Sequence, residues 1–302
     1  MNNILDLEKS NDYIINLIKS NEPFIISRLG IGAETYITHQ YIITNKINTN
    51  YLQMLSNNAG IYNVDSNNII RYINLYIQAI SNSKALAVFP TYIINEQNYF
   101  ANECKLNKIY SRSLEPFYAC LENIKPWTHY LHGKKVLIIN PFVESMKKQI
   151  ANKFQIFKDP HKKIFLDNQE FIFYKSYQTS AGNHIHKNWL ETYTLMCNDI
   201  KKLDDEYNFD IALLGCGGYG LPLCHFIKMN LHKSSIYIGG GLQLLFGVMG
   251  SRWENRDDWK KIIKDNAGPN AGPNAGPNTN FIKPSGDEII NNKNAIENGC
   301  YW

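Results

Sequence analysis

Residues 210–253 read DIALLGCGGYGLPLCHFIKMNLHKSSIYIGGGLQLLFGVMGSRW, and a glycine cluster directly follows each of two short apolar runs. The run 211–214 is too short for a buried helix and is typical of a buried strand, whereas 221–228 has the composition of a helix. The second run, 235–238, again ends in glycine. This order of strand, helix and strand favours an α/β fold, and we predict a Rossmann-like, mainly parallel sheet with helices on both faces.

The two glycine clusters predict a ligand site at the carboxyl edge of that sheet. A strand-to-helix turn presents bare amides and the positive end of a helix dipole, which favour an anion such as phosphate. The alternative is that the glycines only permit tight turns and close helix packing. Clusters on two successive strands favour the ligand site. The residues that we expect at the ligand are Gly215, Gly217, Gly218, Tyr219 and Gly240.

The first cluster differs from the dinucleotide fingerprint G-x-G-x-x-G, because its third glycine falls at position 220. No acidic residue follows the next strand at the distance at which one would hold a ribose. We therefore do not expect NAD, and the same lack argues against an enzyme that uses S-adenosylmethionine.

Six stretches in collinear order carry a family resemblance: SRLGIGAE at 27–34, GKKVLIINPFVES at 133–145, SAGNHIHKNWLETY at 180–193, GCGGYGLPL at 215–223, GGGLQLLFG at 239–247 with SRW after it, and GCYW at 299–302. Together they resemble a group of glycosyltransferases from bacterial polysaccharide clusters, related to the GT-D type. The resemblance covers most of the chain. It implies transfer of a sugar from a nucleotide-sugar donor to a saccharide or lipid-linked acceptor.

The loop 28–34 is the second place where the sequence predicts chemistry. Arg28 follows a predicted strand at 23–27, and an arginine there offers a planar fork to a diphosphate. Gly30 and Gly32 let the next helix begin close to the ligand, and Glu34 would point into the same crevice. We assign Arg28 and Glu34 to catalysis. The alternative is a structural ion pair between these two residues.

The resemblance also implies a divalent metal, Mn²⁺ or Mg²⁺, beside the donor diphosphate. In the GT-D type an R-x-G-D-G-E pattern supplies the carboxylates, and Arg28, Gly30 and Glu34 match it approximately. This chain has Ile31-Gly32-Ala33 between Gly30 and Glu34, which is one residue longer and lacks the aspartate. Glu34 is therefore the single metal ligand that the sequence offers in this loop.

A third strand-end loop follows the predicted strand 136–140. Asn140 ends the strand, and a helix begins through Glu144 and Ser145, so the amides of 143–145 could hold a phosphate. The alternative is an ordinary connection from strand to helix. Because the other two strand-end loops also predict a ligand site, we expect Asn140 and Ser145 to contact the nucleotide-sugar donor.

Further contacts are expected from polar and aromatic side chains near these loops. Gln243 and Trp253 could contact the donor base or sugar, and Arg252 could neutralise the diphosphate. Asn183 and His184 precede a predicted helix at 189–201 and could touch a hydroxyl of the acceptor or sugar, or act as a base. The H-x-H pair at 184–186 lacks further ligands for zinc.

Length and composition are compatible with a soluble enzyme. The 302 residues are 44% hydrophobic, and the net charge of +4 is too mild to indicate a nucleic-acid partner. Six cysteines without a CxxC pair are expected to be reduced thiols. The N-terminus does not resemble a signal peptide, and no apolar run is long enough to cross a bilayer. We expect a cytoplasmic protein, with peripheral contact to anionic lipid open as an alternative.

We expect a single α/β domain over 1–302. Its N-terminal part, 1–130, contains the RLGIGAE loop, and its C-terminal part, 131–302, contains a repeat loop at 265–280. The repeat AGPNAGPNAGPN at 267–278 has no apolar surface to bury, which predicts a flexible, exposed loop.

The sequence thus predicts one site built by separate loops. If Gly30, Asn140, Gly217 and Gly240 all lie at carboxyl ends of parallel strands, they should line one cavity. Glycosyl transfer is the function that we expect. The alternative is a catalytically inactive module that binds a nucleotide or sugar phosphate, or an assembly partner of a transferase, and the missing aspartate favours it.

Overall fold

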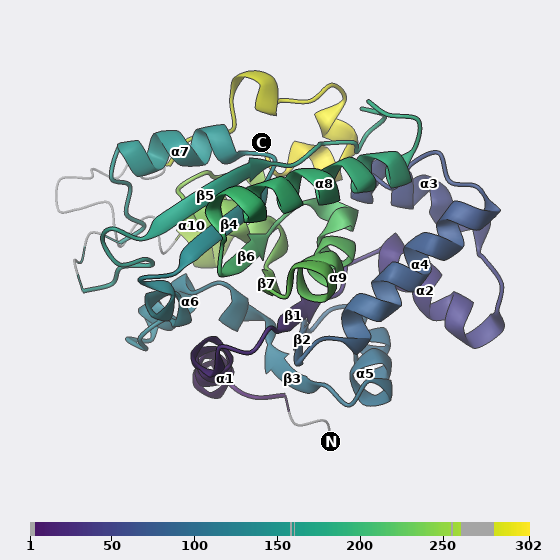
Figure 1. Ribbon diagram of the computed structural model, residues 1–302. Coiled ribbons are helices and arrows are strands. Elements are labelled where there is room, and N and C mark those ends of the chain that lie inside the picture. The colour runs from purple at the N-terminus through teal and green to yellow at the C-terminus, as the bar shows by residue number, and fades with distance from the viewer. Residues whose placement is uncertain (1–3, 158, 160, 255, 261–280) are drawn as a thin grey trace.

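A computed structural model of the chain describes residues 4–157, 159, 161–254, 256–260 and 281–302. Seven strands form one sheet in the order β3-β2-β1-β7-β6-β4-β5, and each pair of neighbours is parallel (Figure 1). The predicted α/β fold with a parallel sheet is confirmed. The strands are β1 (Ile25–Arg28), β2 (Ala85–Val88), β3 (Asn107–Tyr110), β4 (Lys135–Asn140), β5 (Glu170–Lys175), β6 (Ile211–Leu214) and β7 (Ser234–Tyr237).

Helices cover both faces of the sheet, because the central strands are apolar on both sides. Along β4, Val136 and Ile138 enter one core, whereas Leu137 and Ile139 enter the other. The alternation follows from successive side chains of a strand pointing to opposite faces. The helices are α1 (Leu7–Ser20), α2 (Ala33–Thr44), α3 (Leu52–Met54), α4 (Ser66–Ser81), α5 (Ile94–Glu103), α6 (Phe117–Leu121), α7 (Val143–Ala151), α8 (Trp189–Tyr207), α9 (Gly220–Leu231), α10 (Leu242–Leu245) and α11 (Ser251–Glu254).

The two cores belong to different sets of helices. Residues of α2, α4, α5, α8 and α9 pack on one face, and those of α1, α6, α7 and α10 on the other. In Figure 1, α8 and α9 lie in front of the sheet and α1 lies below it. Within the part of the chain that the structure describes, no helix combines the length and apolar character needed to cross a bilayer.

Local signals in the sequence explain where the longer helices begin. Asp65 caps α4 and forms a capping box with Asn68, and the Asn188 side chain accepts from the Glu191 backbone at the start of α8. Such caps satisfy backbone donors that have no partner within the helix. The apolar stripe of α4 then packs on the sheet through Ile69, Ile73 and Ile80, among others.

The order of the strands places a switch point between β1 and β7. β2 and β3 follow β1 outward in one direction, whereas β7, β6, β4 and β5 lie on its other side. Strands from both predicted parts of the chain thus share one sheet. Ligands of open α/β sheets bind outside the carboxyl ends of the strands at such a point.

The C-terminal segment 281–302 returns to this carboxyl edge. The backbone N–H of Arg252 donates to the Cys300 carbonyl (3.0 Å), and that of Ser251 donates to the Trp302 carbonyl (3.1 Å). In Figure 1 this yellow segment lies beside α7. The predicted repeat loop 265–280 lies outside the described residues.

Candidate functional site

One cavity of about 540 Å³ opens at the carboxyl ends of β1, β4, β6 and β7. Gly30, Asn140, Gly217 and Gly240 all line it, which confirms the predicted convergence of the strand-end loops. The carboxyl ends of parallel strands meet at one edge, so loops far apart in the sequence become neighbours. Seven further residues that the sequence predicts at the site also line the cavity: Arg28, Gly32, Glu34, Gly215, Tyr219, Gln243 and Arg252.

Arg28 ends β1 and is held between two aromatic rings. Its guanidinium carbon lies 4.6 Å from the centre of the Phe89 ring and 5.7 Å from that of Tyr237. Its Nη1 donates to the Ile238 carbonyl at 3.0 Å. Buried Nε has no hydrogen-bond partner among the described residues. The guanidinium is therefore fixed in place while part of its donor capacity stays unused.

Gly239 shows why the second glycine cluster is needed. It begins a single 3-10 turn after β7 with φ +76°, and a Cβ on it would lie 2.3 Å from Nη1 of Arg28. A larger residue at this position would push the guanidinium away.

Glu34 lies in the first turn of α2, directly beside Gly30. A Cβ on Gly30 would come within 2.6 Å of the Glu34 carboxyl carbon, so this glycine leaves room for the carboxyl group. The surrounding protein removes water from the carboxyl, which raises its pKa, while the backbone N–H of Glu34 and the charge of Arg28 act in the opposite direction. A carboxylate with a raised pKa binds a proton more tightly than an ordinary glutamate does, which suits it to act as a general base.

The first glycine cluster is held by side chains from two strands, β4 and β7. Asn140 donates from Nδ2 to the Gly215 carbonyl (2.9 Å) and accepts from the Phe142 N–H (2.9 Å). The Tyr237 hydroxyl donates to the Gly217 carbonyl at 2.8 Å. The turn Gly217–Tyr219 is therefore tied to both β4 and β7.

The C-terminal segment contributes to the wall of the cavity. The guanidinium of Arg252 lies 4.5 Å from the centre of the Tyr301 ring and forms an ion pair with Glu297. Gln243 donates from Nε2 to the Tyr301 carbonyl at 3.1 Å. The Tyr301 ring lies against Gly240, where a Cβ would meet it at 2.6 Å.

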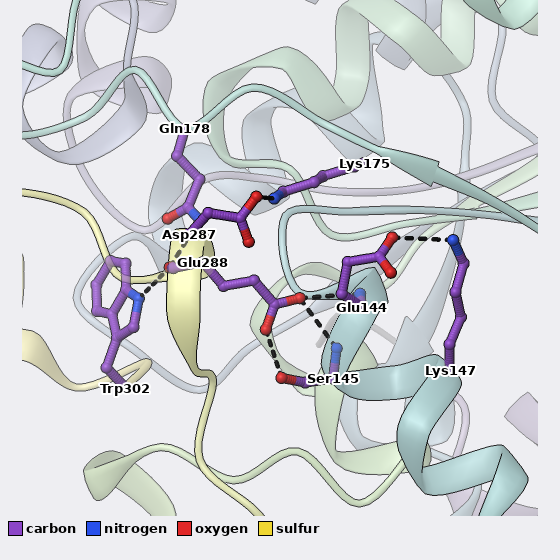
Figure 2. Close-up of polar contacts among 8 residues, drawn as sticks. All are labelled: Glu144, Ser145, Lys147, Lys175, Gln178, Asp287, Glu288 and Trp302. Carbon is purple, nitrogen blue, oxygen red and sulfur yellow. Dashed lines mark hydrogen bonds and ion pairs between the residues drawn. The ribbon is translucent and has the colours of Figure 1, made fainter.

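Ser145, predicted at the donor, lies outside the cavity. Its N–H (3.1 Å) and that of Glu144 (2.9 Å) donate to the Glu288 carboxylate, and its hydroxyl donates to the same group (Figure 2). Glu288 is fully buried, and its carbonyl accepts from Trp302 Nε1 at 2.8 Å. The place of a phosphate at the start of α7 is thus taken by a carboxylate of the chain itself.

Two other residues predicted at the donor are absent from the cavity lining. Trp253 is buried in the core, and Gly218 packs against Ala59 and Ile61. Gly218 therefore has the packing role that was the alternative for the glycine clusters, and the Trp253 ring packs in the core, where the sequence had offered no alternative to a donor contact.

Asn183 and His184 line a neighbouring groove of about 670 Å³. Asn183 donates from Nδ2 to the carbonyls of Ser180 (2.8 Å) and Asn291 (2.9 Å), and the His184 ring stacks on Tyr62 at 4.1 Å. Burial lowers the pKa of His184. The groove adjoins the cavity, because four residues line both: Ser176, Tyr177, Gln178 and Ile290.

Sequence reasoning missed several polar groups of the site. Tyr237 and Glu297 line the cavity, and Glu115 lies at the second glycine turn, where a Cβ on Gly241 would meet its carboxylate. Burial raises the pKa of Glu115 to about 7 against the opposing charges of Arg28, Arg256 and Arg112. The position of Tyr237, at the end of β7 and two residues before Gly239, was a signal, whereas Glu297 and Glu115 carry none.

The side chains present do not fit a metal held by paired carboxylates. No group of three or more His, Cys, Asp or Glu side chains in the described ranges could hold a metal ion. Glu34 and Glu297 are the carboxylates among the described residues of the cavity lining, and Glu297 is paired with Arg252. Glu34 alone is a smaller ligand set than the resemblance implies.

Comparisons with protein-family models, with curated proteins and with solved structures found no significant match to this chain.

Proposed function

We propose that the chain is a glycosyltransferase that moves a sugar from a nucleotide-sugar donor to a saccharide or lipid-linked acceptor. The observation that carries the proposal is the convergence of Arg28, Glu34 and Arg252 on one cavity with the two glycine turns. Its volume of about 540 Å³ lies within the range of small-molecule sites, roughly 300–1,000 Å³.

Glycosyl transfer needs a cation at the leaving diphosphate and a base at the acceptor hydroxyl. Arg28 and Arg252 supply positive charge, and the backbone amides of the glycine turns are further candidate donors to an anion. Glu34 is the candidate base, because its raised pKa improves its affinity for the acceptor proton. The adjoining groove with Asn183 and His184 is the candidate route for the acceptor.

A second candidate is a module that binds a nucleotide or sugar phosphate without turnover. The observation that favours it is the single carboxylate in the loop 28–34, where Ile31-Gly32-Ala33 stands in place of a shorter, aspartate-containing stretch. Binding would then use the same arginines and glycine turns.

The test is a panel of nucleotide sugars and free nucleotides, measured first by thermal stabilisation. A ligand that binds the folded state at about 100 times its Kd adds roughly 2.7 kcal/mol to the free energy of unfolding. Each binding nucleotide sugar is then incubated with saccharide and lipid-linked acceptors, and release of the nucleoside diphosphate is followed. Stabilisation with turnover supports the transferase, stabilisation without turnover supports the binding module, and no stabilisation by any member contradicts both.

A further inference from the structure

The charges in the cavity are balanced within the protein. Arg28, Arg252, Glu34 and Glu297 are the charged side chains among the described residues that line it. Two cations thus accompany two carboxyl groups, but the one ion pair among these four side chains joins Arg252 to Glu297, so an anion that meets both cations replaces a carboxylate only at Arg252.

Arg28 is the cation with unused capacity. No carboxylate of the described residues forms an ion pair with it, and its buried Nε has no partner there. Native proteins leave few buried polar atoms without a hydrogen bond, so the Arg28 guanidinium keeps donor capacity for a further acceptor. The two flanking rings hold the guanidinium but offer it no hydrogen-bond acceptor.

Arg252 has a carboxylate partner that is weakly held. The side chains of Arg252 and Glu297 are 32% and 50% exposed, and an ion pair with this much solvent contributes little to stability. Glu297 and its neighbour Asn298 both adopt left-handed backbone, with φ of 45° and 57°. Asparagine tolerates this conformation but glutamate does so poorly, so the strain in the turn lies at Glu297 itself.

Both arginines line the cavity near the second glycine turn. Arg28 borders Gly239, whereas the Tyr301 ring borders Gly240 and carries the Arg252 guanidinium 4.5 Å from its centre. A diphosphate offers two charged groups in sequence and can meet two guanidinium forks, which a single carboxylate cannot do.

The charged side chains of the cavity are unfavourable for binding a divalent cation. Glu34 is the cavity-lining carboxyl group, within the described residues, that forms no ion pair, and Arg28 already acts on it electrostatically. A metal ion at Glu34 would face the positive guanidinium of Arg28.

We propose that the cavity binds the diphosphate of a nucleotide ligand through Arg28 and Arg252 without a divalent metal, and that the diphosphate displaces the Glu297 carboxylate from Arg252. The proposal rests on the proposed function in so far as the ligand is a nucleotide or nucleotide sugar. It differs from the metal-assisted chemistry that the loop 28–34 would supply with a second carboxylate.

The first experiment measures binding of UDP, GDP, ADP and their common sugar conjugates by calorimetry, in EDTA and in Mn²⁺ or Mg²⁺. We expect the Kd of the best ligand to agree within about twofold between EDTA and metal. Binding that appears only with metal overturns this inference and leaves the proposed function standing. If no ligand of the panel binds in either condition, the proposed function falls and the inference falls with it.

The second experiment removes the competing charge with Glu297→Gln. Because the amide keeps the shape but no longer pairs with the guanidinium, we expect the best ligand of the panel to bind about three- to tenfold more tightly. The control is Glu144→Gln, whose carboxylate is similarly exposed (49%) and pairs with Lys147 on α7. Unchanged or weaker binding by Glu297→Gln, or equal tightening by Glu144→Gln, overturns the displacement.

Discussion

The N-terminus of α7 and the glycine turns after β6 and β7 lie at the same edge of the sheet. A side chain of the protein occupies the first, whereas a cavity lies at the second. At α7 the Glu288 carboxylate accepts from two backbone amides and from the Ser145 hydroxyl (Figure 2). At the glycine turns the described residues leave a cavity that Arg28 and Arg252 border. A strand followed by a helix therefore predicts an anion site. Whether a ligand or a carboxylate of the protein itself occupies that site depends on a segment far away in the sequence.

The largest effect that tests this comparison is expected at the N-terminus of α7, where Glu288 binds the backbone amides. Glu288→Ala leaves three donors at the start of α7 without their acceptor, so we expect the free energy of unfolding to fall by about 3–5 kcal/mol. Urea denaturation measures the loss. The control is Asp287→Ala, whose side chain is 79% exposed and pairs with Lys175, and it should cost less than about 1 kcal/mol. Equal costs for the two variants would show that Glu288 does not close the helix.

A second test uses the carboxyl group of Glu115, which lies at the second glycine turn. Burial raises its pKa to about 7 from an ordinary 4.5, so the folded protein binds the proton more tightly than the unfolded chain does. The stabilisation is complete below pH 4.5 and is lost as pH rises through about 7. Relative to Glu115→Gln, the wild-type protein should lose roughly 3 kcal/mol of unfolding free energy over this window. Parallel pH profiles for the two proteins would contradict the raised pKa.

The third test concerns ligand affinity at Arg28. Arg28→Ala should weaken binding of the best nucleotide ligand by about 1.5–3 kcal/mol, because a charge-assisted hydrogen bond is lost. Calorimetry measures the change. Arg112→Ala is the matched control, since its guanidinium also lies 4.6 Å from an aromatic ring, that of Tyr118, but outside the cavity. Similar weakening by both variants would mean that Arg28 acts through general charge or folding.

Local patterns predicted the centre of the fold better than its edges. The buried strand β6 spans Ile211–Leu214 as expected, because a run of four apolar residues between turns is too short for a buried helix. The edge strands β3 (Asn107–Tyr110) and β5 (Glu170–Lys175) escaped prediction, since both are only partly buried and carry charged residues. A strand that is half exposed needs less apolar sequence, so its signal is weaker.

The site was predictable where strand ends converge, and unpredictable where distant segments meet. Gly30, Asn140 and Gly217 share a cavity because parallel strands place their carboxyl ends together. The burial of Ser145 depends on Glu288, which lies 143 positions further along the chain. The sequence around Ser145 gives no indication of this hydrogen bond.

The seam between β1 and β7 links folding to the binding site. Arg28 and the Ile238 carbonyl, its hydrogen-bond partner across the seam, are 210 positions apart, and Ile25 and Ile26 pair with Ser235 and Ile236. Contacts of such sequence separation form late, because a long loop must close before they can stabilise the chain. A mild destabilisation that parts the seam would separate Arg28 from the Gly239 turn while the strands on either side stay paired. Loss of ligand binding would then precede loss of helical circular dichroism during unfolding.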